Sequence, residues 1–163
     1  MEKRDVLISG WNFAYETEDW YPPLKAALSD VDFAHASWKP AGNAAHTIVE
    51  LVSHLLYYRR RFLFRLKKQP WDISIETNDD TFATTTITSQ QHWDDSLREL
   101  HKVQQDIKSI LGTLDEEGWK SLSPEAPIDR QVLSLMMHDA YHTGQIILIR
   151  KLYGSWPGER EVS

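Results

Sequence analysis

The feature that most constrains this fold is a long apolar segment near the C-terminus, residues 132–153, which contains no proline and a single glycine. Proline and glycine are the residues least favourable inside a helix, so this segment is predicted to form one uninterrupted helix. We place its start at Asp129, whose side chain is suited to capping a helix. Residues at alternating three- and four-residue spacing form a stripe that should face the protein interior: Leu135, His138, His142, Gln145, Ile149 and Leu152.

Three earlier segments also carry apolar residues at helical spacing, at residues 5–31, 47–66 and 89–111. The first is expected to be broken or bent between residues 16 and 22. The second begins with Thr47 followed by Glu50 three residues later, a pattern typical of a capping box. Four long helices without a convincing strand or internal repeat predict an all-α fold, a four-helix bundle.

The connections between these helices are long. Residues 69–88 lose helical periodicity, and a loop of this length in a compact domain is often a functional loop or lid. Connections of about 18 to 20 residues, rather than a few, predict at least one long crossover in the bundle. We assign residues 1–155 to one bundle domain and residues 156–163 to a polar C-terminal tail.

Composition narrows the functional classes. The 163-residue chain has 18 basic and 24 acidic residues, and its basic residues form no large patch of the kind that nucleic-acid binders show. It has no cysteine, which excludes disulfides, thiolate metal ligands and a cysteine nucleophile. The N-terminus does not resemble a signal peptide, and no window is apolar enough to span a membrane. We therefore expect a soluble cytoplasmic protein that binds neither nucleic acid nor membranes.

Three histidines form the candidate site. His138 and His142 are four residues apart, so they share one helix face with Cβ atoms roughly 5–6 Å apart, and both rings can reach one metal ion. His54 lies in the middle of the second helix, beside its apolar stripe. A buried histidine can instead be satisfied by a core hydrogen bond, and for any one of them alone that interpretation is favoured. For the three together, a metal site inside the bundle is the better explanation.

Two carboxylates accompany these histidines. Glu50 is one turn before His54 and Asp139 adjoins His138, so either is a candidate to orient a ligand or to act as a base. For Glu50 the alternative is simple capping, and the two are evenly balanced. The remaining histidines, at positions 35, 46, 92 and 101, are interpreted as surface residues, with His46 at the helix entrance.

The basic run Arg59-Arg60-Arg61 has two interpretations. The first is a solvated face near a helix C-terminus, where positive charge is favourable. The second is a binding site for an anionic thiol cofactor. The first is preferred on the sequence alone.

The order of several motifs resembles the DinB/YfiT-like proteins over nearly the whole chain. The most specific part is His138-Asp139-Ala140-Tyr141-His142-Thr143-Gly144-Gln145 with the upstream pair His54-Leu55. Supporting motifs are Trp20-Tyr21-Pro22-Pro23-Leu24, Trp38-Lys39-Pro40 and Trp93. The resemblance implies a four-helix bundle, often homodimeric, with a divalent metal held by residues that match His54, His138 and His142. Relatives of this kind include bacillithiol- or mycothiol-dependent S-transferases, a maleylpyruvate isomerase domain and proteins described as metal-dependent hydrolases.

These inferences predict a metal-dependent enzyme of the thiol S-transferase or hydrolase type that acts on a small molecule. Three imidazoles suit zinc or nickel ahead of iron or manganese, and a low-molecular-weight thiol is a further expected cofactor. Glu50 and Asp139 are the candidate catalytic residues, and Tyr141 and Gln145 the candidate substrate contacts. The alternative is a non-catalytic dimeric bundle with a structural or vestigial metal.

Overall fold

The computed structural model describes residues 2–121 and 126–158, and it is all-α over these residues. Four helices are long and the others are single turns or short pieces. In chain order they are α1 (Lys3–Tyr15), α2 (Leu24–Ala27), α3 (Phe33–Ala36), α4 (Ile48–Leu66), the 3₁₀ helix η1 (Asp79–Ala83), α5 (Gln90–Thr113), α6 (Glu116–Lys120) and α7 (Ile128–Tyr153). The predicted break in the first helical segment is confirmed, since α1 ends before residue 16 and α2 starts at residue 24.

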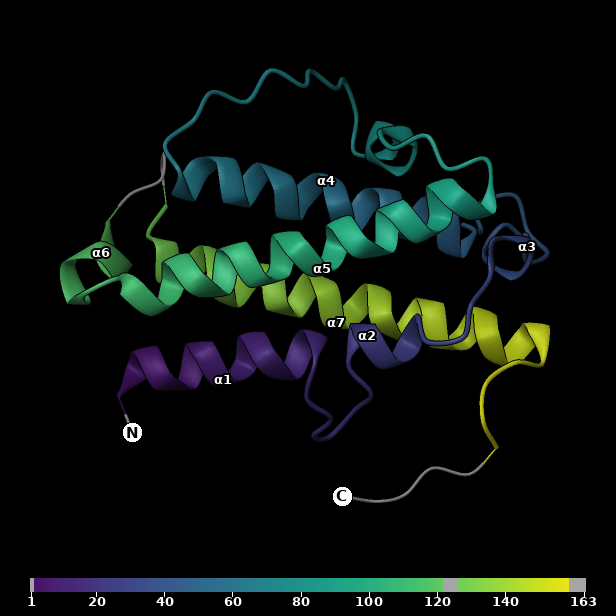
Figure 1. The fold of residues 1–163 in the computed structure, drawn as a ribbon, viewed down its shortest axis with the longest axis horizontal. Helices are drawn as coiled ribbons and strands as arrows, with labels where there is room; N and C mark the ends of the chain where they lie inside the picture. Colours follow the sequence, from purple (N-terminus) through teal and green to yellow (C-terminus); the bar gives the residue numbers. More distant parts are fainter. Residues whose placement is uncertain (1, 122–125, 159–163) are drawn as a thin grey trace.

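The four long helices form a bundle in which α1 packs on α7, α7 on α4, α4 on α5 and α5 on α1. Figure 1 shows that α4 and α5 run in the same direction and that α1 and α7 run in the opposite one. The chain therefore has to return along the bundle between α4 and α5. It does so through residues 67–89, which pass along the outer side of α4 and carry η1. This connection is the long crossover that the sequence predicted.

The first of the two caps predicted from the sequence for the long helices α4 and α7 is confirmed. Thr47 and Glu50 form the capping box of α4, and Ser89 caps α5 by accepting a hydrogen bond from a backbone N–H. Gly154 ends α7 in the left-handed conformation, with φ of 89°, which glycine adopts without strain. The prediction for Asp129 was wrong: the cap of α7 is Pro127, and the carboxylate of Asp129 pairs with Lys3 of α1 instead.

The interior divides into two apolar clusters along the bundle axis. One gathers the first half of α4 and the end of α7 with α2 and α3, and includes Leu51 and Ile146. The other gathers α1, α6 and the start of α7, and includes Trp11 and Val132. Buried polar residues in the middle of α4, α5 and α7 lie between the two clusters. The three histidines singled out by the sequence lie in or beside this polar layer.

Two details of the sequence interpretation change. Leu152, predicted to face inward, is 62% exposed, because it lies on the same outward side of α7 as the exposed Leu148 one turn earlier. His35, predicted at the surface, is buried, and its ring stacks on Tyr153 with centroids 4.0 Å apart. The connection at residues 122–125 and the tail at 159–163 lie outside the described residues. In the described chain, none of the helices has a stretch both long and apolar enough to cross a membrane.

Candidate metal centre

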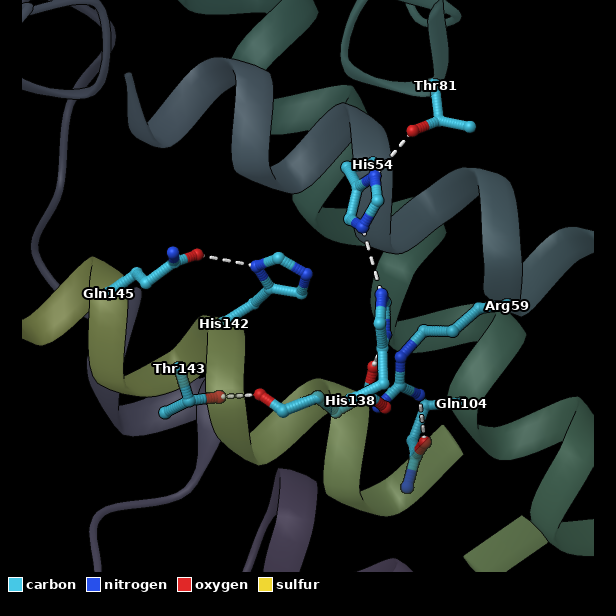
Figure 2. Close-up of polar contacts among 9 residues, drawn as sticks. His54, Arg59, Thr81, Gln104, His138, His142, Thr143 and Gln145 are labelled. Atoms are coloured by element: carbon cyan, nitrogen blue, oxygen red, sulfur yellow. Dashed lines mark hydrogen bonds and ion pairs between the residues drawn. The ribbon is translucent and has the colours of Figure 1, made fainter. Parts of the chain in front are cut away.

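The structure brings together the three histidines that the sequence singled out. His54 projects from the middle of α4, and His138 and His142 project from consecutive turns of α7 (Figure 2). One ring nitrogen from each lies within 4.8 Å of the others. His54 and His142 are buried, and His138 is half-buried. Among the described residues, this is the one group of three or more potential ligands in metal-binding proximity.

A hydroxyl from the crossover fixes the ring of His54. The Oγ1 atom of Thr81, in η1, lies at hydrogen-bonding distance from Nδ1 of His54. The hydroxyl proton of Thr81 is donated to the carbonyl oxygen of Asn78, so Thr81 can only accept from His54. Nδ1 of His54 therefore carries the proton, and its Nε2 presents a lone pair.

Acceptors on α7 hold the other two rings in the same state. The side-chain oxygen Oε1 of Gln145 accepts from Nδ1 of His142 at 2.6 Å. A carboxylate oxygen of Asp139 lies 3.4 Å from Nδ1 of His138. A carboxylate and an amide oxygen are both acceptors, so each ring nitrogen facing them is the donor. Outer partners of this kind are what metal-ligating histidines ordinarily have, because they fix the tautomer and the ring orientation.

The inner nitrogens now face each other without protons. Nε2 of His54 and Nε2 of His138 are 2.9 Å apart, a hydrogen-bond distance across which neither atom has a hydrogen to donate. Two lone pairs at this distance repel unless a cation or an added proton lies between them. In a tetrahedral zinc site with Zn–N bonds of about 2.0–2.1 Å, two nitrogens are about 3.3 Å apart. The residues present therefore fit a divalent metal held by three imidazoles.

Burial makes an added proton unfavourable at this site. Burial, together with the nearby rings of His142 and His138, lowers the pKa of His54 to about 3. Burial also lowers the pKa of His142, against the opposing effect of its hydrogen bond to Gln145. Neutral imidazole is the form that binds metal, so both effects favour a bound cation over a proton.

A buried ion pair lies directly behind the histidines. Arg59 of α4 contacts Asp139 at 2.5 Å and donates to the side chain of Gln104 on α5, and the side chains of Arg59 and Asp139 have no exposed surface. The guanidinium also lies over the ring of Trp11, 5.0 Å from its centroid. The prediction that Arg59 is a solvated residue was wrong, because α4 is enclosed by α5, α7 and η1 and has almost no solvated side at its middle.

A cavity of about 690 Å³ opens beside the three histidines. Phe82 of η1 forms part of its wall, stacked between His46 and His54 with centroid separations of 3.8 and 4.1 Å. Tyr141 and Gln145, the predicted substrate contacts, both line this cavity. Tyr141 is 65% exposed, which places it at the rim.

The predicted catalytic carboxylates lie elsewhere. Oε2 of Glu50 accepts from the backbone N–H of Thr47 at 2.6 Å, so this carboxylate caps α4 and does not line the cavity. Asp139 lies behind His138 rather than in the cavity. These positions suit capping and ligand orientation respectively, and a catalytic role for either stays a prediction.

Sequence reasoning missed Thr81 and Phe82, the two residues of η1 that contact His54. The only available signal was the length of the aperiodic 69–88 segment, which marked it as functional without naming a residue. It also missed His46 as a cavity residue, since a position just before a helix cap looked exposed.

Comparisons with known proteins agree with this fold. Residues 22–146, which make up most of the chain and include all three histidines, match the DinB superfamily. A solved structure described as a conserved protein from Enterococcus faecalis is similar in fold, with a TM-score of 0.67 and 15% sequence identity over 93% of this chain and 97% of that one. No functionally curated protein matches this sequence. The match over most of the chain shows that this protein belongs to the DinB superfamily.

Proposed function

We propose that this protein is a divalent-metal-dependent enzyme that acts on a small molecule. The observation that carries the proposal is the position of the three histidines at the wall of a 690 Å³ cavity. Catalytic zinc sites have three protein ligands and take the fourth from water or substrate, whereas structural sites are closed by four protein ligands. The described chain supplies three, and the cavity lies on the side from which a fourth would come.

The reaction type that we propose is thiol S-transfer or hydrolysis, which the likeness to DinB/YfiT-like proteins favours. A cation held by His54, His138 and His142 would polarise a substrate oxygen or sulfur as a Lewis acid. The chain's own residues orient the site: Thr81, Asp139 and Gln145 fix the three rings. Phe82 and Tyr58 pack their rings against His54 and limit the access of water to it.

Metal content tests the first part of this proposal. Purified protein, a His138→Ala variant and a His92→Ala control should be compared by elemental analysis after dialysis against zinc or nickel. His92 is exposed on α5 and lies outside the site, so its variant should bind one equivalent, as wild type does. His138→Ala should lose the ion. If wild type retains no more metal than His138→Ala, the metal proposal fails.

Binding of an added thiol tests the second part of the proposal, that a small molecule can reach the ion through the cavity. In cobalt-substituted protein, 2-mercaptoethanol should change the visible absorption spectrum if a small molecule can reach the ion. An unchanged spectrum would favour the alternative of a non-catalytic bundle with a structural metal.

The surface of α7 favours a homodimer, whether or not the protein is an enzyme. Large apolar side chains at 49–67% exposure recur along one side of this helix: Leu133, Met137, Tyr141, Leu148 and Leu152. From Leu133 to Leu152 the stripe is about 28 Å long at the rise of an α-helix. An exposed apolar patch of this extent is typical of a protein interface, and two copies can pair through it about a twofold axis.

Light scattering after size-exclusion chromatography tests the dimer. Wild type should run as a dimer, and Met137→Glu with Leu148→Glu should run as a monomer because charges then oppose each other across the interface. Ser109→Glu, an exposed change on α5 and so away from the stripe, is the control. A wild-type protein that is monomeric at micromolar concentration would contradict the proposed homodimer.

A further inference from the structure

The cavity beside the histidines continues along α4 past the metal site. His54, Tyr58, Arg61 and Arg65 all line it, at intervals of four, three and four residues that keep them on one face of the helix. With a rise of about 1.5 Å per residue, Arg61 lies about 10 Å and Arg65 about 16 Å from His54 along the helix axis. The cavity therefore has a cluster of imidazoles in one part and guanidinium groups in another.

Arg61 differs from its neighbours in how its charge is satisfied. Arg59 is bound by Asp139 and Gln104, and Arg60 by Glu99 and Thr85. The half-buried Arg61 makes neither a hydrogen bond nor an ion pair with any residue in the described ranges, although it lies at the cavity wall.

The other charged groups that the structure describes around the cavity do not neutralise Arg61. Asp79 is the acidic residue among the described lining residues, and it forms no ion pair with Arg61. Arg65, one turn further on, donates to the side chain of Gln131 at 3.1 Å, which orients its guanidinium beside the same wall. The guanidinium of Arg61 therefore faces this part of the wall without an acidic partner among the described residues.

We propose that this cavity binds a small molecule with a carboxylate or phosphate group about 10 Å from the atom that reaches the histidines, and that Arg61 recognises this anion. A guanidinium presents paired N–H donors that match two oxygens of a carboxylate or phosphate. Partial burial strengthens this attraction, because it replaces some of the surrounding water. The proposal rests on the proposed function, since it takes the histidine cluster as the end at which the reactive group binds.

Thiols that differ in the charge of the group far from the sulfur, or in its distance from the sulfur, test the proposal. Cobalt-substituted protein should be titrated with 6-mercaptohexanoate, with the neutral 6-mercaptohexanol and with the short acid mercaptoacetate, following the thiolate-to-cobalt absorption band. The long acid should bind about tenfold more tightly than the alcohol, as expected for one charge-assisted contact at a partly exposed site. Mercaptoacetate, which is too short to reach Arg61, should show no such advantage from its charge.

Substitutions of Arg61 and of Lys67 show which residue recognises the anionic group of the thiol. Arg61→Gln should abolish the tenfold preference while leaving the alcohol's affinity unchanged. Lys67→Gln, which removes the same charge just after α4 and outside the cavity, should keep the preference. Unchanged binding of the alcohol to Arg61→Gln also shows that the variant is folded. If that variant does not fold, Arg61→Lys replaces it and should retain a smaller preference.

The outcomes separate the two proposals. Equal affinities for the long acid and the alcohol in wild type, or an equal loss in Arg61→Gln and Lys67→Gln, would overturn the anion site and leave the metal enzyme standing. Absence of the thiolate band with every probe would overturn both, since no substrate atom could then reach the ion.

Discussion

Arg59 of α4 and Asp139 of α7 form an ion pair, 2.5 Å from nitrogen to oxygen, in which neither side chain has exposed surface. The pair joins the two helices that carry the histidines. Asp139 also contacts Nδ1 of His138, so the same carboxylate takes part in the core and in the candidate metal site. The stability of the bundle and the orientation of a ligand are therefore linked through one residue.

Replacing Arg59 with Met should destabilise the fold strongly. The variant leaves the carboxylate of Asp139 buried without its partner, at a cost of about 3–5 kcal/mol. Urea denaturation measures this. Arg60→Met is the control: its ion pair with Glu99 is partly exposed, so its loss should cost about 1 kcal/mol or less. Equal losses in the two variants would contradict a special role for the buried pair. Adding Asp139→Leu to Arg59→Met should recover part of the lost stability.

Replacing Asp139 with Asn should weaken metal binding by about 10- to 100-fold, because the acceptor behind His138 loses its charge. Competition with a chromophoric chelator gives the affinity. Arg59→Met serves as the comparison, since it disturbs the same ion pair and leaves the carboxylate beside His138. Equal affinities in these two variants would mean that loss of folding, rather than the lost charge of the acceptor, explains the effect.

The contact between Thr81 and His54 predicts that the crossover affects metal affinity. Thr81→Val keeps the shape of the side chain and removes the oxygen that accepts from Nδ1, so affinity should fall by about 10-fold or more. Thr86→Val, an exposed change in the same crossover, should have no effect. An unaltered affinity in Thr81→Val would show that η1 does not orient the ligand.

His35 should contribute to the pH dependence of stability. Burial lowers the pKa of His35 below its ordinary value, with a further contribution from Arg150. The unfolded chain then takes up a proton at a higher pH than the folded one does. The ionisation of His35 therefore leaves the free energy of unfolding unchanged above about pH 6.5. As the pH falls below that value, the free energy of unfolding decreases, because the unfolded chain binds a proton more readily than the folded one.

The free energy of unfolding in the presence of a chelator should be compared at about pH 7.5 and about pH 5.5 for wild type and His35→Gln. The variant should lose less stability on acidification. The chelator removes metal binding from the comparison, and the difference between the two proteins removes the contribution of the other histidines. An equal loss in both would assign the pH dependence elsewhere.

The histidine site could be predicted from the sequence because it depends on local periodicity. Four-residue spacing on a helix puts His138 and His142 on one face wherever that helix packs. The long aperiodic segment before α5 likewise predicted the crossover. His35 and Arg59 were misplaced for a common reason: a helical pattern gives the direction of a side chain on its own helix, but not the elements that cover it.

The sequence by itself determined the helices, the class of fold and the three histidines that share the interior. Only the tertiary structure decided that a threonine from an aperiodic loop lies behind the ring of His54 and that a buried arginine holds the carboxylate of Asp139. It also decided that Arg61, among three adjacent arginines, faces the cavity. These choices depend on contacts between segments far apart in the chain, which packing of the whole bundle selects and local propensity does not encode.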